Sequence, residues 1–86
     1  MEINESEFVI QTGNKLIVLE NVETMFITNT GKIIFYMKSG KEQSLDVDCF
    51  ENIGEARNTY KKISETITTI QKLKYNGKSG KTLFGR

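Results

Sequence analysis

One short string near the C-terminus carries the residue types of a phosphate-binding loop. Residues 77–82 read Gly-Lys-Ser-Gly-Lys-Thr. The full motif is G-x-x-x-x-G-K-[ST] between a strand and a helix, because backbone amides and the helix N-terminus hold the phosphates. Tyr75 stands where the first glycine is needed, a helix is expected before the string, and only residues 83–86 follow it. The string therefore does not predict a nucleotide site.

The acidic residues and the single cysteine are the other candidates for chemistry. Asp46 and Asp48 are spaced to project from one face of a strand, roughly 7 Å apart, and such a pair can hold a divalent ion or transfer protons. The same alternation is expected of the solvated face of an antiparallel strand. Cys49 falls on the apolar side, and the chain has no histidine to activate it. We predict no catalytic residue, no metal site, no cofactor and no small-molecule substrate, hence a protein that is not an enzyme.

The charges are unevenly distributed along the chain. The 12 basic and 11 acidic residues give a net charge of +1. Residues 1–60 carry five basic and ten acidic groups, a balance of −5, whereas residues 61–86 carry seven basic groups and one acidic group, a balance of +6. Such a basic end is a solvated tail, a contact for the acidic half of a neighbouring subunit, or a site for phosphates and stacked bases. The candidate anion or nucleic-acid contacts are Lys72, Lys74, Lys78, Lys81 and Arg86.

The first half of the chain has the pattern of strands separated by tight turns. Gly13-Asn14 suits a two-residue type II′ hairpin loop, and Gly31 and Gly40 mark two further turns. Turns this short force neighbouring strands to run antiparallel. We predict an antiparallel meander of four to five strands, formed by residues 8–11, 15–20, 24–29, 32–38 and 42–49.

A helix is predicted after Phe50, where the apolar period changes from two to about 3.6. Two capping signals compete for its start, Asp48 with Glu51 and Asn52 with Glu55. We prefer the second, because Gly54 is less costly near a helix end. Asn76-Gly77 is the expected stop. The fold class is therefore α+β, with one domain over residues 1–74, a flexible basic tail over 75–86, and an apolar helix stripe of Ile53, Ala56, Tyr60, Ile63, Ile67 and Ile70.

The strands are apolar on both faces, which one helix cannot cover. On the second predicted strand, Leu16 and Val18 point opposite to Ile17 and Leu19. An uncovered apolar face usually marks an interface, and a symmetric dimer lets one patch serve both subunits. In the alternative, the sheet curls into a partial barrel and buries both sets. The open face that we expect to bind a protein partner or a second copy contains Ile17, Leu19, Phe26, Ile34 and Tyr36.

The order of strands followed by one long helix resembles the single-stranded-DNA-binding fold of the PC-four type of transcription coactivators. That resemblance implies a dimer that binds nucleic acid. The order of elements around Asn21-Val22 and Gly40 is also similar to small uncharacterised proteins of Gram-positive bacteria and their phages.

Two functional hypotheses follow. The first is a non-enzymatic protein-interaction module that self-associates or binds a partner, such as a bacterial, phage or mobile-element accessory protein. The second is a single-stranded nucleic-acid-binding module that uses the sheet lysines and the basic tail. We expect a cytoplasmic protein without membrane contact, because no run approaches the roughly 18 apolar residues of a membrane span. The acidic residues 1–5 are unlike a signal peptide, and Cys49 is the only cysteine.

Overall fold

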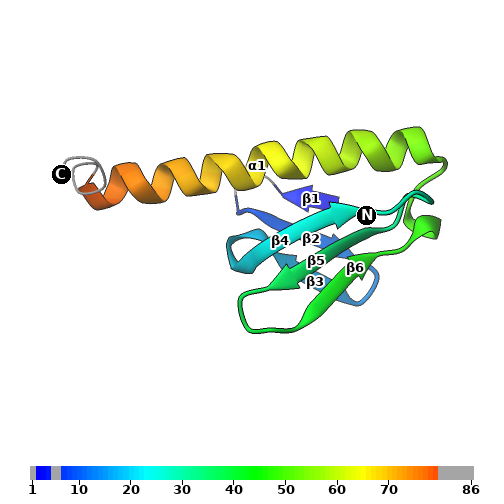
Figure 1. The fold of residues 1–86 in the computed structure, drawn as a ribbon, viewed down its shortest axis with the longest axis horizontal. Helices are drawn as coiled ribbons and strands as arrows, with labels where there is room; N and C mark the ends of the chain where they lie inside the picture. The colour runs from blue at the N-terminus through cyan, green and yellow to red at the C-terminus, as the bar shows by residue number, and fades with distance from the viewer. Residues whose placement is uncertain (1, 5–6, 80–86) are drawn as a thin grey trace.

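The computed structural model describes residues 2–4 and 7–79 as two antiparallel sheets and one long helix (Figure 1). The first sheet has strands β1 (Glu2–Asn4), β2 (Val9–Thr12) and β3 (Lys15–Val18) in that order. The second has β4 (Val22–Ile27), β5 (Ile33–Met37) and β6 (Glu42–Leu45). The remaining elements are the short 3-10 helices η1 (Leu19–Asn21) and η2 (Val47–Cys49) and the helix α1 (Ile53–Ser79). The predicted α+β class is confirmed, but the single meander is wrong.

The 3-10 turn η1 divides the strands into two sheets. The strand predicted over residues 15–20 ends at Val18, and η1 redirects the chain into β4. The pairing of β4 with β5 then shifts register between Val22 and Thr24. Because a bulge bends its strand and increases the local twist, β4 leaves the plane of the first sheet. The chain therefore stacks one sheet over the other instead of extending one meander.

Two further predictions about strands are wrong. Strand β1 was not predicted, yet it pairs with β2 and places Ile3 opposite Ile10. The predicted strand over residues 42–49 ends at Leu45, and η2 follows, with Cys49 N donating to Asp46 O at 3.0 Å. Val47 is consequently 49% exposed rather than aligned with Leu45 on a buried face.

The two-residue loop between β2 and β3 forms as predicted. Thr12 pairs with Lys15 across it, and Gly13 has a φ of +55° while Asn14 does not have a positive φ. A positive φ at the first loop residue alone is the pattern of a type II′ turn, which matches the twist of the flanking strands. Gly31, in the turn between β4 and β5, has a φ of +102°, and an added Cβ there would lie 3.4 Å from the Cβ of Ala56. This turn therefore lies directly against α1.

Helix α1 begins where the preferred capping signal placed it. Glu55 N donates to Asn52 Oδ1 at 2.8 Å, and Glu51 N donates to Glu55 Oε1 at 2.7 Å. The predicted stop at Asn76-Gly77 is wrong, since the helix continues to Ser79. A single glycine costs only about 1 kcal/mol within a helix and does not by itself end one. Figure 1 shows the C-terminal turns of α1 extending past the sheets.

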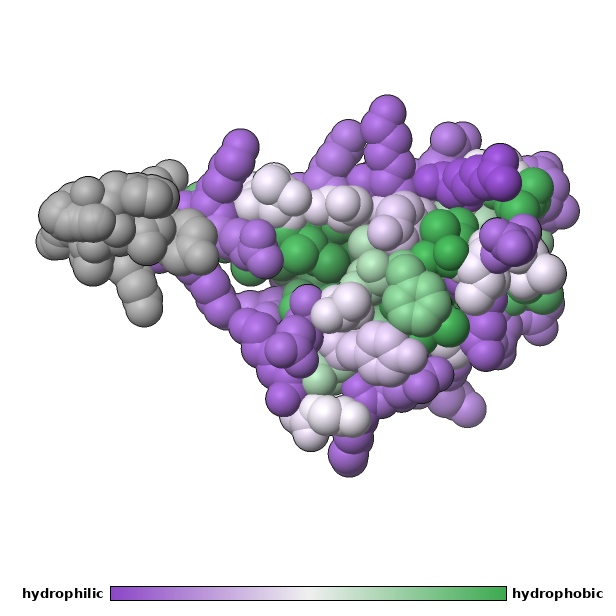
Figure 2. All heavy atoms as spheres, in the orientation of Figure 1, coloured by the Kyte–Doolittle hydropathy of each residue, from purple (hydrophilic) through white to green (hydrophobic). Residues whose placement is uncertain are grey.

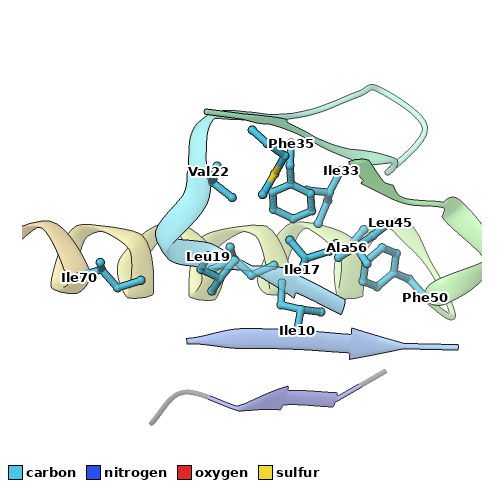
Figure 3. Packing of buried hydrophobic residues seen from close by; sticks show 12 residues of the cluster. Ile10, Ile17, Leu19, Val22, Ile33, Phe35, Leu45, Phe50, Ala56 and Ile70 are labelled. Atoms are coloured by element: carbon cyan, nitrogen blue, oxygen red, sulfur yellow. The ribbon is translucent and has the colours of Figure 1, made fainter. Parts of the chain in front are cut away.

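The core lies between the inner faces of the two sheets, and α1 closes one side of it (Figure 3). Strand β5 contributes Ile33, Phe35 and Met37, and the helix stripe contributes Ala56, Ile63 and Ile70. Ile17 and Leu19 are 0% and 1% exposed, so the face that we expected to be open on this strand is buried. The alternative of one curled sheet that buries both apolar sets is not observed either, because two separate sheets enclose the core and Leu16, Phe26 and Tyr36 stay exposed.

Candidate protein-binding surface

The outer face of the β4-β5-β6 sheet carries the most exposed aromatic residues of the described chain. Phe26 on β4 and Tyr36 on β5 are 39% and 40% exposed, and their ring centroids lie 5.7 Å apart with the planes tilted by 34°. Ile34 pairs directly with Phe26 across the two strands and is half-buried. These three residues, named the aromatic face here, keep the orientation that the sequence predicted for them.

Two of the five residues predicted for this surface belong elsewhere. Ile17 and Leu19 point into the space between the sheets, as Figure 3 shows, and the opposite side of β3 is the exposed one. Leu16 is accordingly 58% exposed and Val18 half-buried. Alternation in the sequence showed that β3 has two apolar faces. It gave no signal for which of them the second sheet would cover.

The aromatic face has a polar and charged border. Lys32, just before β5, lies 3.9 Å from Asp46 between Nζ and Oδ1, and Lys38 follows the strand at its other end. Glu42 pairs with Tyr36 from β6. Charges of both signs around an apolar centre are the usual composition of a protein-binding patch, with its water-accessible rim.

A shallow groove of about 170 Å³ runs between β4 and the middle of α1. Tyr60 donates its hydroxyl to the carbonyl oxygen of Met25 at 3.4 Å and joins the helix to the edge of β4. Ile67 and Val22 line the same groove. In Figure 2, hydrophobic residues gather between the helix and the sheet that faces the viewer, within a hydrophilic surround. The apolar surface therefore continues from the aromatic face toward α1.

The candidates for chemistry are not brought together. Asp46 Oδ1 accepts from the Ser44 hydroxyl at 3.5 Å, while Asp48 lies on η2 rather than on a strand face. The Cys49 sulfur lies 3.9 Å from Thr12 Oγ1 and is half-buried. Within residues 2–4 and 7–79, no cluster of three or more histidine, cysteine or acidic side chains could hold a metal ion.

The basic candidates near the C-terminus are only partly described. Lys72 is exposed, and Lys74 Nζ lies 3.7 Å from Glu20 Oε2, which joins α1 to η1. The Lys78 side chain, Lys81, Arg86 and the predicted flexible tail beyond Ser79 lie outside what the structure describes. Lys74 thus has an intramolecular partner, which the sequence did not indicate.

Comparisons with known proteins add no relative. No family model, no curated protein and no solved structure matches the chain. The likeness in element order to the PC-four type of coactivators therefore transfers no residue to this protein. Among the described residues, no helix has the length and apolar character needed to cross a membrane.

Proposed function

We propose that this chain is a small non-enzymatic protein-interaction module, an accessory protein of a bacterium or phage, whose contact surface is the aromatic face. One observation carries the proposal: Phe26 and Tyr36 form an exposed ring pair on a sheet face that no described element covers. Aromatic side chains are enriched at the centres of protein interfaces, because each buries a large area with few rotatable bonds. We place the protein in the cytoplasm, since its only cysteine is not in a disulfide.

Self-association through the same face is part of the proposal. With about 40% exposure each, the two rings offer roughly 160 Å² of accessible surface if an aromatic side chain carries about 200 Å². Stable interfaces bury about 800 Å² on each partner. The rings alone are too small for an obligate dimer. We therefore propose a weak symmetric homodimer that a larger partner displaces.

Light scattering after size-exclusion chromatography, over a concentration series up to several hundred micromolar, tests this. We expect the mean mass of the wild-type chain to rise toward that of a dimer with concentration. Phe26→Ser combined with Tyr36→Ser should remain monomeric. Leu73→Ser is the matched control, because Leu73 is 54% exposed on α1, away from the sheet face. A wild-type chain that stays monomeric throughout, or a double variant that associates equally well, would refute self-association through this face.

The second candidate function is single-stranded nucleic-acid binding. It is favoured by the position of Lys32 and Lys38 at the two ends of β5, on the strand that carries Tyr36. Sheet aromatics stack on bases while neighbouring lysines neutralise phosphates. Anisotropy of a labelled oligonucleotide over a salt series tests this, because counterion release predicts a steep fall of affinity with salt. Tyr36→Ser should then weaken binding, and an absence of binding at about 50 mM salt would exclude this function.

A further inference from the structure

A second surface, distinct from the aromatic face, is the cleft between β3 and the β5–β6 hairpin. Its volume is about 480 Å³, within the range of ligand-binding sites. Leu16 and Val18 form one wall, and Met37 and Gln43 form the other. The rim is polar and consists of Asn21, Lys38, Ser39 and Lys41.

Strand β3 presents an open edge to this cleft. It ends the β1-β2-β3 order, so within the described residues it has a pairing strand on one side only. Leu19 N donates to Phe8 O at 2.9 Å, which makes Phe8 and Leu19 a hydrogen-bonded pair. Along an antiparallel ladder, hydrogen-bonded pairs alternate with non-hydrogen-bonded ones. The pair of Val9 with Val18 is therefore a non-hydrogen-bonded one, as is that of Gln11 with Leu16. The N–H and C=O groups of Leu16 and Val18 consequently point away from β2, toward the cleft.

An unpaired acceptor lies in the opposite wall. Gln43 pairs with Phe35, whose side chain faces the core, so Gln43 projects from the inner side of β6. Its Oε1 atom is buried, and no described residue donates a hydrogen bond to it. A buried acceptor without a donor is unfavourable, and a rotation of the Gln43 side chain toward the cleft would let an N–H group of a bound molecule satisfy it.

The charges around the cleft are of one sign. Lys38 and Lys41 lie on its rim, and no carboxylate lines it. Beside the cleft, the Lys15 ammonium on β3 donates to Ser44 O on β6 at 2.9 Å, and Lys38 N donates to Asn21 O at 2.8 Å. The first of these contacts links β3 to β6, and the second links η1 to the end of β5. The cleft suits an occupant with negative charge.

We propose that this cleft binds a short extended acidic segment of a partner protein, which adds to β3 as a further strand. Main-chain pairing with Leu16 and Val18 provides affinity in this mode, and alternate side chains provide specificity. Apolar side chains of the segment pack on the Leu16 and Val18 wall, and its carboxylates face Lys38 and Lys41. One of its N–H groups donates to Oε1 of Gln43 after that side chain rotates toward the cleft. The inference rests on the proposed protein-binding role but uses a different surface, which shares Lys38 with the border of the aromatic face.

Fluorescence polarisation with a labelled hexapeptide of alternating glutamate and valine, added to the full chain, tests the proposal. We expect saturable binding to one site. Lys38→Gln combined with Lys41→Gln should weaken it about fivefold or more, and replacing the peptide's glutamates by glutamine should do the same, since each charge pair contributes modestly at an exposed rim. The matched control is Lys61→Gln, an exposed lysine on α1, which should leave the affinity unchanged.

The backbone pairing has its own test. Two further versions of the peptide carry N-methyl groups at the odd or at the even residues. In an added strand, only every second N–H group faces β3, so only one of the two versions loses the donors that β3 needs. We expect that version not to bind and the other to bind. In a ¹H–¹⁵N correlation spectrum, the intact peptide should shift the amides of Leu16, Val18 and Gln43 most.

Four results would overturn the proposal: no saturable binding up to millimolar peptide, equal binding of both methylated peptides, no effect of the lysine substitutions, or equal competition by free glutarate. The last would identify a simple anion site. The Phe26→Ser and Tyr36→Ser variant should bind the peptide normally, so a failure of the aromatic face and a failure of this cleft remain distinguishable.

Discussion

Two regions of the molecule differ sharply: the space between the sheets, and the outer face of the second sheet. The sequence predicted that side chains from both regions would share one open surface. Ile17 is 0% exposed, whereas Tyr36 is 40% exposed. Both lie on short strands that are apolar on two faces. Ile17 is covered because the second sheet packs over it. Tyr36 stays exposed because no further described sheet or helix packs on the outer face of its own sheet. The burial of a residue in such strands is therefore decided by how the sheets stack, not by the alternation within one strand.

The sharpest test of this contrast uses neighbouring aromatics on β5. Phe35→Ala should lower the free energy of unfolding by about 3–5 kcal/mol, because Phe35 is fully buried and its removal leaves a cavity. Tyr36→Ala should lower it by less than about 1 kcal/mol, since that ring is 40% exposed and packs on Phe26 at the surface. Urea unfolding followed by circular dichroism measures both. Similar losses for the two variants would remove the distinction between the faces.

The same contrast on β3 tests the corrected orientation of that strand. Ile17→Ala should cost about 2–4 kcal/mol of unfolding free energy, because the side chain is enclosed by both sheets. Leu16→Ala should cost under about 1 kcal/mol, because more than half of Leu16 is exposed. A larger loss for Leu16→Ala than for Ile17→Ala in denaturant titrations would mean that Leu16, and not Ile17, faces the space between the sheets.

An intermediate effect is expected at the start of α1, where an exposed residue has a specific structural role. Asn52→Ala removes the acceptor for Glu55 N and should cost about 1 kcal/mol. Asn58→Ala, at an exposed site within the helix, should be neutral or slightly stabilising, because alanine has the higher helix propensity. Thermal unfolding by calorimetry compares the two. Equal melting temperatures would mean that the cap contributes nothing.

The smallest effect is expected on the border of the aromatic face. Lys32→Gln breaks the 3.9 Å contact with Asp46, in which both side chains are largely exposed, and should change stability by no more than about 0.5 kcal/mol. A double-mutant cycle with Asp46→Asn isolates the pair. A coupling above about 1 kcal/mol would show that this border is a structural element rather than a solvated rim.

The elements with strong local signals were predictable. Six apolar residues at helical spacing identified α1, and Asn52 with Glu55 identified its start. Gly13-Asn14 identified the hairpin between β2 and β3. These features depend on residues close together in the chain, so the sequence contains the relevant contacts.

The elements that depend on tertiary packing were not predictable in the same way. The η1 turn has no glycine or proline, and Leu19 within it is buried by distant residues. Val47 continues the alternation of β6 although its backbone has turned. Of the predicted site, Phe26, Ile34 and Tyr36 share one face as expected, whereas Ile17 and Leu19 do not. The cleft next to Leu16 forms only because the β5–β6 hairpin lies beside β3, and these segments are far apart in the sequence.

The order of strands within each sheet has a consequence for how the chain folds. Within each sheet, every strand pairs with its neighbour in the sequence, and the connections between them are short. Closing such short loops costs little chain entropy, so the strand pairs within each sheet form from contacts that are local in the sequence. The helix differs, because Ile70 reaches a pocket that Phe8 also lines, about sixty residues earlier. Docking of α1 therefore brings together residues far apart in the sequence, as does the packing of the two sheets around their shared core.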